Sequence, residues 1–327
     1  MIEPAPAAHS ARAFDVTVVG ELNLDLILYG LPAELASERE HLATGIALTL
    51  GSSSAILAHN LAALGARVGF VSRIGTDPLG AISLQRLAQA GLDVSRVKQA
   101  AGPTATGITV ILPSTAERKI LTYPGTMFEM CYEDLDLDYL GDARHFHLSS
   151  YFLHRALLPR TRELFQQMKQ RGLTTSLDTN DDPDDQWNAG VWEVFPFVDI
   201  LFLNEREARK LSGAQTPAGA FARLASRVPI LVVKLGAQGA LLRTAGREFR
   251  VPSVAVTVED TVGAGDSFDA GFLYQYVRGA GLQACLRFAA VAGAFSTTRA
   301  GGTEAFRDKE RLQAFMAQHV PEGEIHD

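Results

Sequence analysis

The sequence contains little cysteine and no long apolar run, and both shortages exclude whole classes of protein. Its 327 residues include two cysteines, Cys131 and Cys285, whose spacing fits neither a disulfide framework nor a zinc site. No stretch reaches the roughly 18 apolar residues of a membrane span. Residues 1–13 lack the basic and apolar regions of a signal peptide. We therefore expect a cytoplasmic protein without a membrane partner, with a disordered tail at residues 1–13.

Positive charge is also scarce. The chain has 30 Lys plus Arg against 37 Asp plus Glu, a net charge of −7, and six of the basic residues are lysines. This balance does not provide the phosphate-neutralising surface of a nucleic-acid-binding protein. Hydrophobic residues make up 47% and charged residues 20%, which is typical of a chain that buries a large core. We expect a small-molecule partner and a single domain over residues 14–327.

Strand-like and helix-like segments alternate along most of the chain. Such repeated βαβ units predict a mainly parallel sheet with helices on both faces. The expected strands are 16–19, 68–71, 146–148, 174–177, 200–203 and 230–233, and the expected helices are 52–64, 78–90, 159–170, 266–277 and 282–297.

Two segments depart from this alternation. Residues 24–28 form an apolar run just after the first strand, and residues 108–112 and 119–122 flank a polar turn, as in a β-hairpin. We expect these strands, drawn from about 23–50 and 103–125, to form a flap on the α/β core. At least one face of so small a sheet needs a partner.

The most informative motif is the segment 260–268, Asp-Thr-Val-Gly-Ala-Gly-Asp-Ser-Phe. Gly263, Ala264 and Gly265 directly precede an amphipathic helix, where backbone N–H groups and the helix dipole attract anionic oxygens. Asp266, in the same turn, is placed to accept a proton from a hydroxyl that attacks a bound phosphorus. The spacing equally fits a plain turn in which Asp266 caps the helix.

Competing motifs fail on single residues. Phe268 replaces the third glycine of a dinucleotide fingerprint, no lysine follows a glycine as in a Walker A loop, and residues 51–55 lack the second glycine of a nucleophile elbow. The acidic cluster 178–185 has Pro183 where an EF-hand needs glycine, so we interpret it as a solvated loop. His145 and His147 share one strand face without a third ligand, which favours a structural role.

Segment 260–268 resembles the C-terminal signature of the ribokinase-like (PfkB) sugar and nucleoside kinases, and the resemblance extends over nearly the whole chain from Val16. It implies a three-layer α/β core with a mainly parallel sheet and a small β-sheet lid, which often joins two subunits in a homodimer. It also implies ATP-dependent phosphorylation of a sugar hydroxyl, with Asp266 as general base and the amides of 263–265 as anion hole. A nucleoside kinase and a non-catalytic ligand-binding relative are the alternatives.

The resemblance assigns further site residues. It implies ATP, Mg²⁺ and a monovalent cation such as K⁺ as the groups that they bind. The substrate would contact Asn23, Asp25, Gly51, Ser52 and Asn180; ATP would contact Asn204, Lys234, Gly236 and Gly239; Glu207 would act on Mg²⁺; and the monovalent cation would lie among Asp260, Val262, Ser296, Arg299 and Gly301.

One signature differs from the family pattern. The family has a Gly-Gly pair, followed four residues after the second glycine by an asparagine that meets the sugar, whereas this chain has Gly51-Ser52 and Ile56. A branched alkyl group cannot donate to or accept from a hydroxyl. We therefore expect a substrate with an apolar or less hydroxylated edge at Ile56.

Overall fold

The computed structural model describes residues 12–113 and 118–321. Residues 1–11 of the expected tail and the expected hairpin turn at 114–117 lie outside this range. Among the described residues, no helix is long and apolar enough to cross a membrane.

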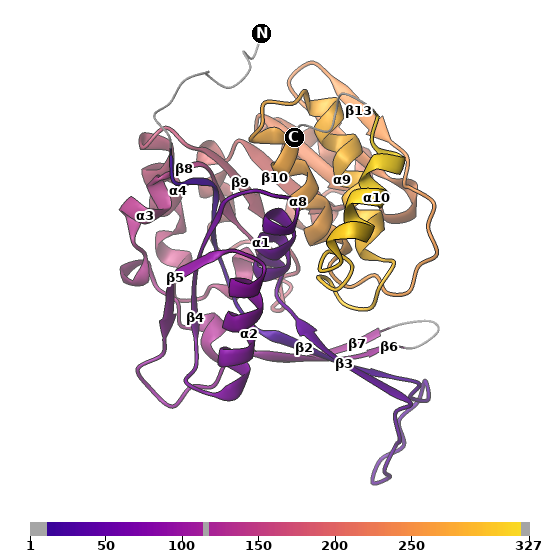
Figure 1. The fold of residues 1–327 in the computed structure, drawn as a ribbon. Helices are drawn as coiled ribbons and strands as arrows, with labels where there is room; N and C mark the ends of the chain where they lie inside the picture. Colours follow the sequence, from indigo (N-terminus) through magenta and orange to yellow (C-terminus); the bar gives the residue numbers. More distant parts are fainter. Residues whose placement is uncertain (1–11, 114–117, 322–327) are drawn as a thin grey trace.

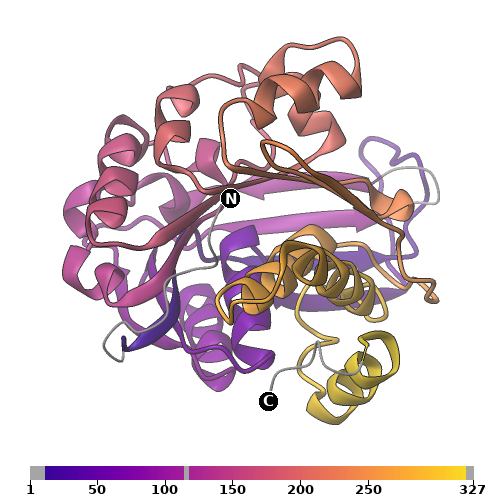
Figure 2. The same cartoon turned by 90° about the horizontal axis from the view of Figure 1, so that it is seen from above.

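The core is a nine-stranded sheet whose central strands are all parallel (Figures 1 and 2). Its order is β13-β12-β11-β10-β9-β8-β1-β4-β5, and the two strands at one edge, β12 and β13, run antiparallel to their neighbours. The bounds are β1 Phe14–Val19, β4 Val68–Ile74, β5 Asp93–Gln99, β8 Ala143–Leu148, β9 Thr174–Asp178, β10 Ile200–Asn204, β11 Ile230–Lys234, β12 Ala240–Arg243 and β13 Glu248–Val251.

Helices cover both faces of this sheet, as Figure 2 shows from above. One face carries α1 Ser53–Ala63, α2 Pro78–Gln89, α8 Ala264–Tyr276, α9 Leu282–Ser296 and α10 Lys309–His319. The other carries α3 Leu137–Gly141, α4 Thr161–Gln170, α5 Val191–Val194, α6 Glu205–Ser212 and α7 Pro217–Ala225. Short 3₁₀ turns lie at Gly125–Phe128, Tyr132–Asp134, Tyr151–Leu153, Leu158–Arg160, Phe195–Phe197 and Gly236–Gln238.

The strands supply side chains to two separate cores. On β1, Val18 packs in the core beneath α1, α8 and α9, whereas Val19 packs in the core beneath α4 and α7. On β10, Phe202 belongs to the first core and Leu203 to the second. Successive side chains of a strand point to opposite faces. A strand buried on both faces is therefore apolar throughout, which explains why the strands of this sequence read as continuous apolar runs.

A second, four-stranded sheet projects from the core (Figure 1). It consists of β2 Leu24–Tyr29, β3 Gly45–Leu50, β6 Ile108–Pro113 and β7 Arg118–Tyr123, in the order β3-β2-β6-β7. Ile27 and Ile111 on its inner face pack against Val262, which precedes α8. This contact joins the lid sheet to the glycine turn.

The predicted fold class is confirmed: an α/β core with a large, mainly parallel sheet and a small separate sheet. The sequence did not predict β5, β12 and β13 or the helices α6, α7 and α10. The acidic loop differs from the solvated loop that we expected, because Asp178 and Asp182 are buried. Asp182 accepts hydrogen bonds from three backbone N–H groups of its own loop.

Candidate active site

The glycine turn forms the N-terminus of α8. Gly263 is the N-cap residue, with φ +71°, and no side chain caps this end of the helix. Glycine fits this left-handed conformation, and a Cβ here would meet Gly302 Cα at 2.5 Å. Ala264 N–H donates a long 3.3 Å bond to Thr261 O. The first amides of a helix have no intrahelical acceptor, so this uncapped end is suited to an anion.

Asp266 stands in the first turn of α8, two residues inside the helix rather than at its cap. Removal from water raises the pKa of Asp266 to about 6, opposed by the Lys234 ammonium and reinforced by the negative charge of Asp178. Ser53, at the start of α1, donates a hydrogen bond to Asp266, and α1 runs beside α8 (Figure 1). A carboxylate with a pKa near 6 is well matched to accept a proton near neutral pH.

A buried cluster of Lys234, Asp178 and Asp269 lies next to the turn. Lys234 Nζ donates to Asp178 Oδ2 at 2.6 Å and to Asp269 Oδ2 at 3.0 Å. Burial alone would lower the pKa of Lys234, but the two aspartates hold it well above its usual range. A Cβ on Gly265 would lie 3.3 Å from Lys234 Nζ, so the ammonium lies directly against the glycine turn.

The residues predicted to contact the substrate lie together at the end of β1 and the base of the lid. Asp25 belongs to β2 and Gly51 follows β3, and a Cβ on Gly51 would come within 2.1 Å of Asp25 Oδ1 and 2.9 Å of Asn23 Nδ2. Only glycine fits this close approach. Asn23 Oδ1 is buried and has no hydrogen-bond partner among the described residues, which leaves an acceptor for a ligand hydroxyl.

Glu21 connects this region with the start of α1 and with Ser150. Its carboxylate accepts from Ser54 Oγ at 2.6 Å, Ser150 Oγ at 2.7 Å and Ser53 N–H at 3.1 Å. Burial opposes its charge, but His154 and the serine hydroxyls lower the pKa of Glu21 to about 2. Asn180 joins the network by donating to Ser150 Oγ at 3.2 Å.

Ser52 and Ile56 occupy the positions that differ from the family signature. Ser52 caps α1 by accepting from Ala55 N–H at 3.1 Å, and it donates to Glu21 O at 2.7 Å. Its φ of +62° is the kind of conformation that glycine adopts without strain. Ile56 is 2% exposed, and its methyl groups pack under Gly263 and Gly302. Ile56 therefore supports the glycine turn from below, and the expected substrate with an apolar or less hydroxylated edge at this position stays a prediction.

Asn204 and Glu207 form a capping box at the start of α6. Asn204 Oδ1 accepts from Glu207 N–H at 2.9 Å, and Glu207 Oε2 accepts from Asn204 N–H at 2.8 Å. Burial and the nearby Asp178 raise the pKa of Glu207 to about 7, although Lys234 opposes the rise. The three-residue spacing of Asn204 and Glu207 thus has a structural reason, and their roles toward ATP and Mg²⁺ stay predictions.

The nucleotide-side glycines lie in the turn between β11 and β12. Gly236 and Gly239 have φ values of +58° and +89°. A Cβ on Gly239 would meet Val251 O at 1.9 Å. Both positions therefore favour glycine for backbone reasons, and their contact with ATP stays a prediction.

The residues predicted to hold a monovalent cation come from two adjoining loops. Asp260 ties the loops together, because its carboxylate accepts from Val262 N–H and Gly301 N–H, each at 3.0 Å. Thr297 O also accepts from the N–H groups of residues 259 and 260. Two side chains of the predicted set point to partners elsewhere: Ser296 Oγ donates to Gly293 O, and Arg299 pairs with Asp308. Backbone carbonyls would therefore have to supply most of the ligands at this position.

His145 and His147 have the structural role that we expected. Their ring nitrogens form hydrogen bonds with the hydroxyls of Thr174, Ser176 and Ser149 at 2.6–2.8 Å. Burial lowers the pKa of His147 to about 3, so its ring is neutral at physiological pH. Among residues 12–113 and 118–321, no three His, Cys, Asp or Glu side chains converge as metal ligands.

Comparison with known proteins identifies the family. Residues 13–309 match the model of the family described as pfkB family carbohydrate kinase. The chain belongs to this family. This pfkB kinase is 26% identical over 312 residues to 2-dehydro-3-deoxygluconokinase of Bacillus subtilis. The aligned region covers 90% of this chain and 96% of that protein. It is 28% identical over 278 residues to a fructokinase of Klebsiella pneumoniae, and this aligned region covers 80% of this chain and 90% of the fructokinase.

A solved structure shares the fold of this pfkB kinase. An Escherichia coli protein in complex with ATP and Mg²⁺ superposes with a TM-score of 0.82 and 24% identity, covering 94% of this chain and all of that one. The family and its named members make this chain an ATP-dependent sugar kinase.

Sequence reasoning missed Glu21 and Asp269. Glu21 lies just past the end of β1, where ligands of parallel sheets bind, and that position was the available signal. Asp269 lies three residues after Asp266 on α8, so helical spacing places both on neighbouring positions of one face. Its partner Lys234, however, is 35 residues away in sequence.

Proposed function

We propose that this pfkB kinase transfers the γ-phosphoryl group of ATP to a hydroxyl of a neutral sugar. The observation that carries the proposal is the pair formed by the uncapped N-terminus of α8 and Asp266 in its first turn. The turn offers amides for anionic oxygens, and Asp266 offers a base with a pKa near 6. Phosphoryl transfer requires these groups together with positioning and metal-ion charge.

In the proposed mechanism, Asp266 accepts the proton of the sugar hydroxyl as its oxygen attacks the γ-phosphorus. The new O–P bond forms while the bond to the β-phosphate oxygen breaks, and ADP leaves. The amides at 263–265 stabilise the negative charge on the transferred group.

The carboxyl groups on the nucleotide side fit a requirement for Mg²⁺–ATP. Asp178, Glu207, Asp266 and Asp269 share one ammonium, that of Lys234, and the pKa of Glu207 is raised to about 7. Magnesium would neutralise phosphate charge during transfer and is held in proteins by one or two carboxylates plus phosphates. Glu207 is the carboxylate that we assign to it, and Asn204 positions Glu207 through the capping box.

The preference for a neutral sugar follows from the side chains at the substrate end. This end of the site offers two amides, Asn23 and Asn180, and one carboxylate, Asp25. Behind them, Glu21 accepts a hydrogen bond from Ser150, to which Asn180 donates. Carboxylates and amides accept hydroxyl hydrogens well, and the carboxylates repel anionic substrates. Lys234 is already paired with two aspartates.

A substrate panel tests this function. ATP consumption is measured with neutral sugars such as ribose and fructose, with a sugar acid such as 2-dehydro-3-deoxygluconate, and with nucleosides. Turnover of a neutral sugar supports the proposal. Preferential turnover of the sugar acid would remove the neutral-sugar assignment, preferential turnover of a nucleoside would support the nucleoside-kinase alternative, and nucleotide binding without any turnover would support a non-catalytic relative.

We further propose that two copies of the chain pair through the outer face of the lid. Strand register assigns Asp25, Ile27, Thr109 and Ile111 to the inner face, where all four are buried. On the alternate positions, Ile46 is 70% exposed and Leu121 58% exposed, whereas Leu24 and Leu50 at the base of the sheet are buried in the core. An apolar outer face on a thin sheet favours a second copy, while the inner face closes over the sugar and excludes water.

A further inference from the structure

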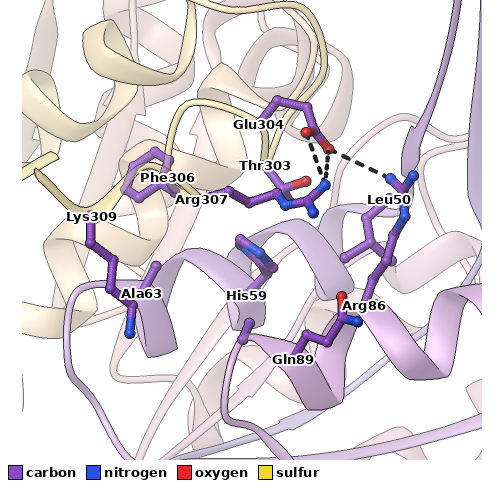
Figure 3. A pocket seen from close by; sticks show the side chains of 11 residues that line it. Leu50, His59, Ala63, Arg86, Gln89, Thr303, Glu304, Phe306, Arg307 and Lys309 are labelled. Carbon is purple, nitrogen blue, oxygen red and sulfur yellow. Dashed lines mark hydrogen bonds and ion pairs between the residues drawn. The ribbon is translucent and has the colours of Figure 1, made fainter. Parts of the chain in front are cut away.

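Two groups of charged side chains lie beside α1, one at each half of the helix. At its second half, the charges in a pocket of about 170 Å³ are paired with one another, because Glu304 contacts both Arg86 and Arg307 (Figure 3). At the first residues of the helix lies Glu21, a buried carboxylate with no part in the proposed mechanism. The contacts of Glu21 lead both to the catalytic base and to the sugar end of the site.

Glu21 is surrounded by hydrogen-bond donors. Its carboxylate accepts from Ser54 Oγ, Ser150 Oγ and Ser53 N–H at 2.6–3.1 Å. His154 Nε2 lies 3.4 Å from the same carboxylate. Burial opposes the charge, but these donors lower the pKa of Glu21 to about 2. A buried, ionised carboxylate with this many donors is fixed in one orientation.

Ser53 links Glu21 to the catalytic base. Its backbone N–H donates to Glu21, and its side chain donates to Asp266. Ser53 and Asp266 are both half-buried, whereas Glu21 is only 3% exposed. A donor on one oxygen of a carboxylate orients the group and leaves the other oxygen free to accept a proton. Glu21 therefore acts on Asp266 through Ser53.

Ser150 links Glu21 to the sugar end. Ser150 Oγ donates to Glu21 and accepts from Asn180 Nδ2 at 3.2 Å. Glu21, Ser150 and Asn180 follow β1, β8 and β9, which are adjacent strands of the sheet. Ligands of parallel sheets bind at these carboxyl ends. The hydrogen bond holds the Asn180 amide in place, so Glu21 also acts on a residue assigned to the substrate.

Three residues of this network have left-handed backbone conformations: Ser52 with φ +62°, Ser150 with φ +53° and Asn180 with φ +52°. Such conformations are uncommon outside glycine and persist where neighbouring contacts impose them. Ser52 donates to the Glu21 carbonyl oxygen at 2.7 Å, and Ser150 donates to the Glu21 carboxylate. Strained positions of this kind gather at functional sites, which favours a role for Glu21 in the reaction as well as in folding.

We propose that Glu21 is a positioning residue for phosphoryl transfer. Through Ser53 it holds Asp266 in the orientation that accepts the hydroxyl proton, and through Ser150 it holds Asn180 toward the sugar. Misplacing a reacting group by about 1 Å costs about 100-fold in rate. This role rests on the functions proposed for Asp266 and Asn180, and Glu21 itself transfers no proton.

Steady-state kinetics separates the two arms of the network. Ser53→Ala should lower kcat about tenfold at nearly unchanged sugar KM, because it loosens the base. Ser150→Ala should raise the sugar KM about tenfold at nearly unchanged kcat, because it frees Asn180. Glu21→Gln should do both. Ser83→Ala is the matched control, since Ser83 is a buried serine of α2 that bonds only to its own helix, and it should keep both constants.

The pH profile distinguishes this role from a purely structural one. Ser53→Ala removes a donor that favours the charged form of Asp266, so the kinetic pKa near 6 should rise. Ser54→Ala loses its bond to Glu21 and should keep the wild-type kinetic pKa. The charged groups that face Asp266 are the same in both variants: Lys234, Asp178 and Glu21.

A double-variant cycle tests whether Glu21 acts through Ser53. Glu21→Gln combined with Ser53→Ala should have the kcat of Glu21→Gln alone, within about twofold, whereas independent effects multiply. Multiplied effects, or single variants with wild-type kcat, KM and pH profile, would overturn the role of Glu21. If Glu21→Gln does not fold, the opposite kinetic effects of Ser53→Ala and Ser150→Ala decide. Full activity of Asp266→Asn would instead overturn the proposed function, so the two failures are distinguishable.

Discussion

Lys234 Nζ lies 2.6 Å from Asp178 Oδ2, in an ion pair that the protein buries beside the glycine turn at residues 263–265. Asp178 ends β9 and Lys234 ends β11, so the pair spans the carboxyl ends of two strands separated by β10. Lys234 also contacts Asp269 of α8, so this helix belongs to the same cluster. The cluster therefore joins the sheet to α8.

Replacing Lys234 by methionine should destabilise the fold strongly. Lys234→Met leaves Asp178 and Asp269 buried without a countercharge, and breaking a buried pair in this way costs about 3–5 kcal/mol. Lys210→Met is the control, because Lys210 pairs with Asp185 at the surface, where such pairs contribute roughly 1 kcal/mol or less. Urea unfolding measures both. Equal losses in the two variants would contradict the structural role of Lys234.

The pH dependence of catalysis should reflect Asp266. Its pKa is raised to about 6, and the base acts when deprotonated, so kcat/KM should rise with pH through about 6 and level above it. Glu207 has a pKa raised to about 7, and Glu207→Gln separates the two groups because glutamine preserves a capping box. The step near 6 should persist in that variant. A profile that is flat from pH 5 to pH 7 would exclude Asp266 as the titrating base.

Potassium should raise activity over tetramethylammonium at equal ionic strength. We propose that the carbonyls of the loops joined by Asp260 bind a monovalent cation behind the anion-binding turn, where tetramethylammonium is too large to fit. Asp260→Asn should reduce the response to potassium. Equal rates in the two salts would remove the cation site while leaving the assignment of Asp266 intact.

Charge on the outer face of the lid should separate the proposed dimer. Sedimentation velocity should give a dimer for the wild type and a monomer for Ile46→Asp combined with Leu121→Asp. Val258→Asp is the control, because Val258 is also large, apolar and 56% exposed but lies outside the lid. A wild-type monomer, or dissociation by Val258→Asp alone, would refute pairing through the lid.

The sequence predicted the features that depend on neighbouring residues. The glycine turn, Asp266 and the following helix lie within one short segment, so the spacing predicted a turn followed by a helix there and left an anion site and a plain capping turn both open. Lys234 and Asp178, in contrast, are 56 residues apart, and nothing in either strand predicts that they meet. Glu21 similarly gains its partners from α1 and from Ser150. The burial of Ile56 against Gly263 and Gly302 could not be predicted either, because these glycines lie far from Ile56 in sequence.

Sugar-dependent ADP formation by the wild type and by Asp266→Asn tests the central claim most directly. The variant keeps the size of the side chain but cannot accept the proton, so kcat should fall by about 10²- to 10⁴-fold. Melting temperature and nucleotide binding, measured on the same samples, should remain those of the wild type. A correctly folded Asp266→Asn variant that retains more than a tenth of the wild-type kcat would contradict the account.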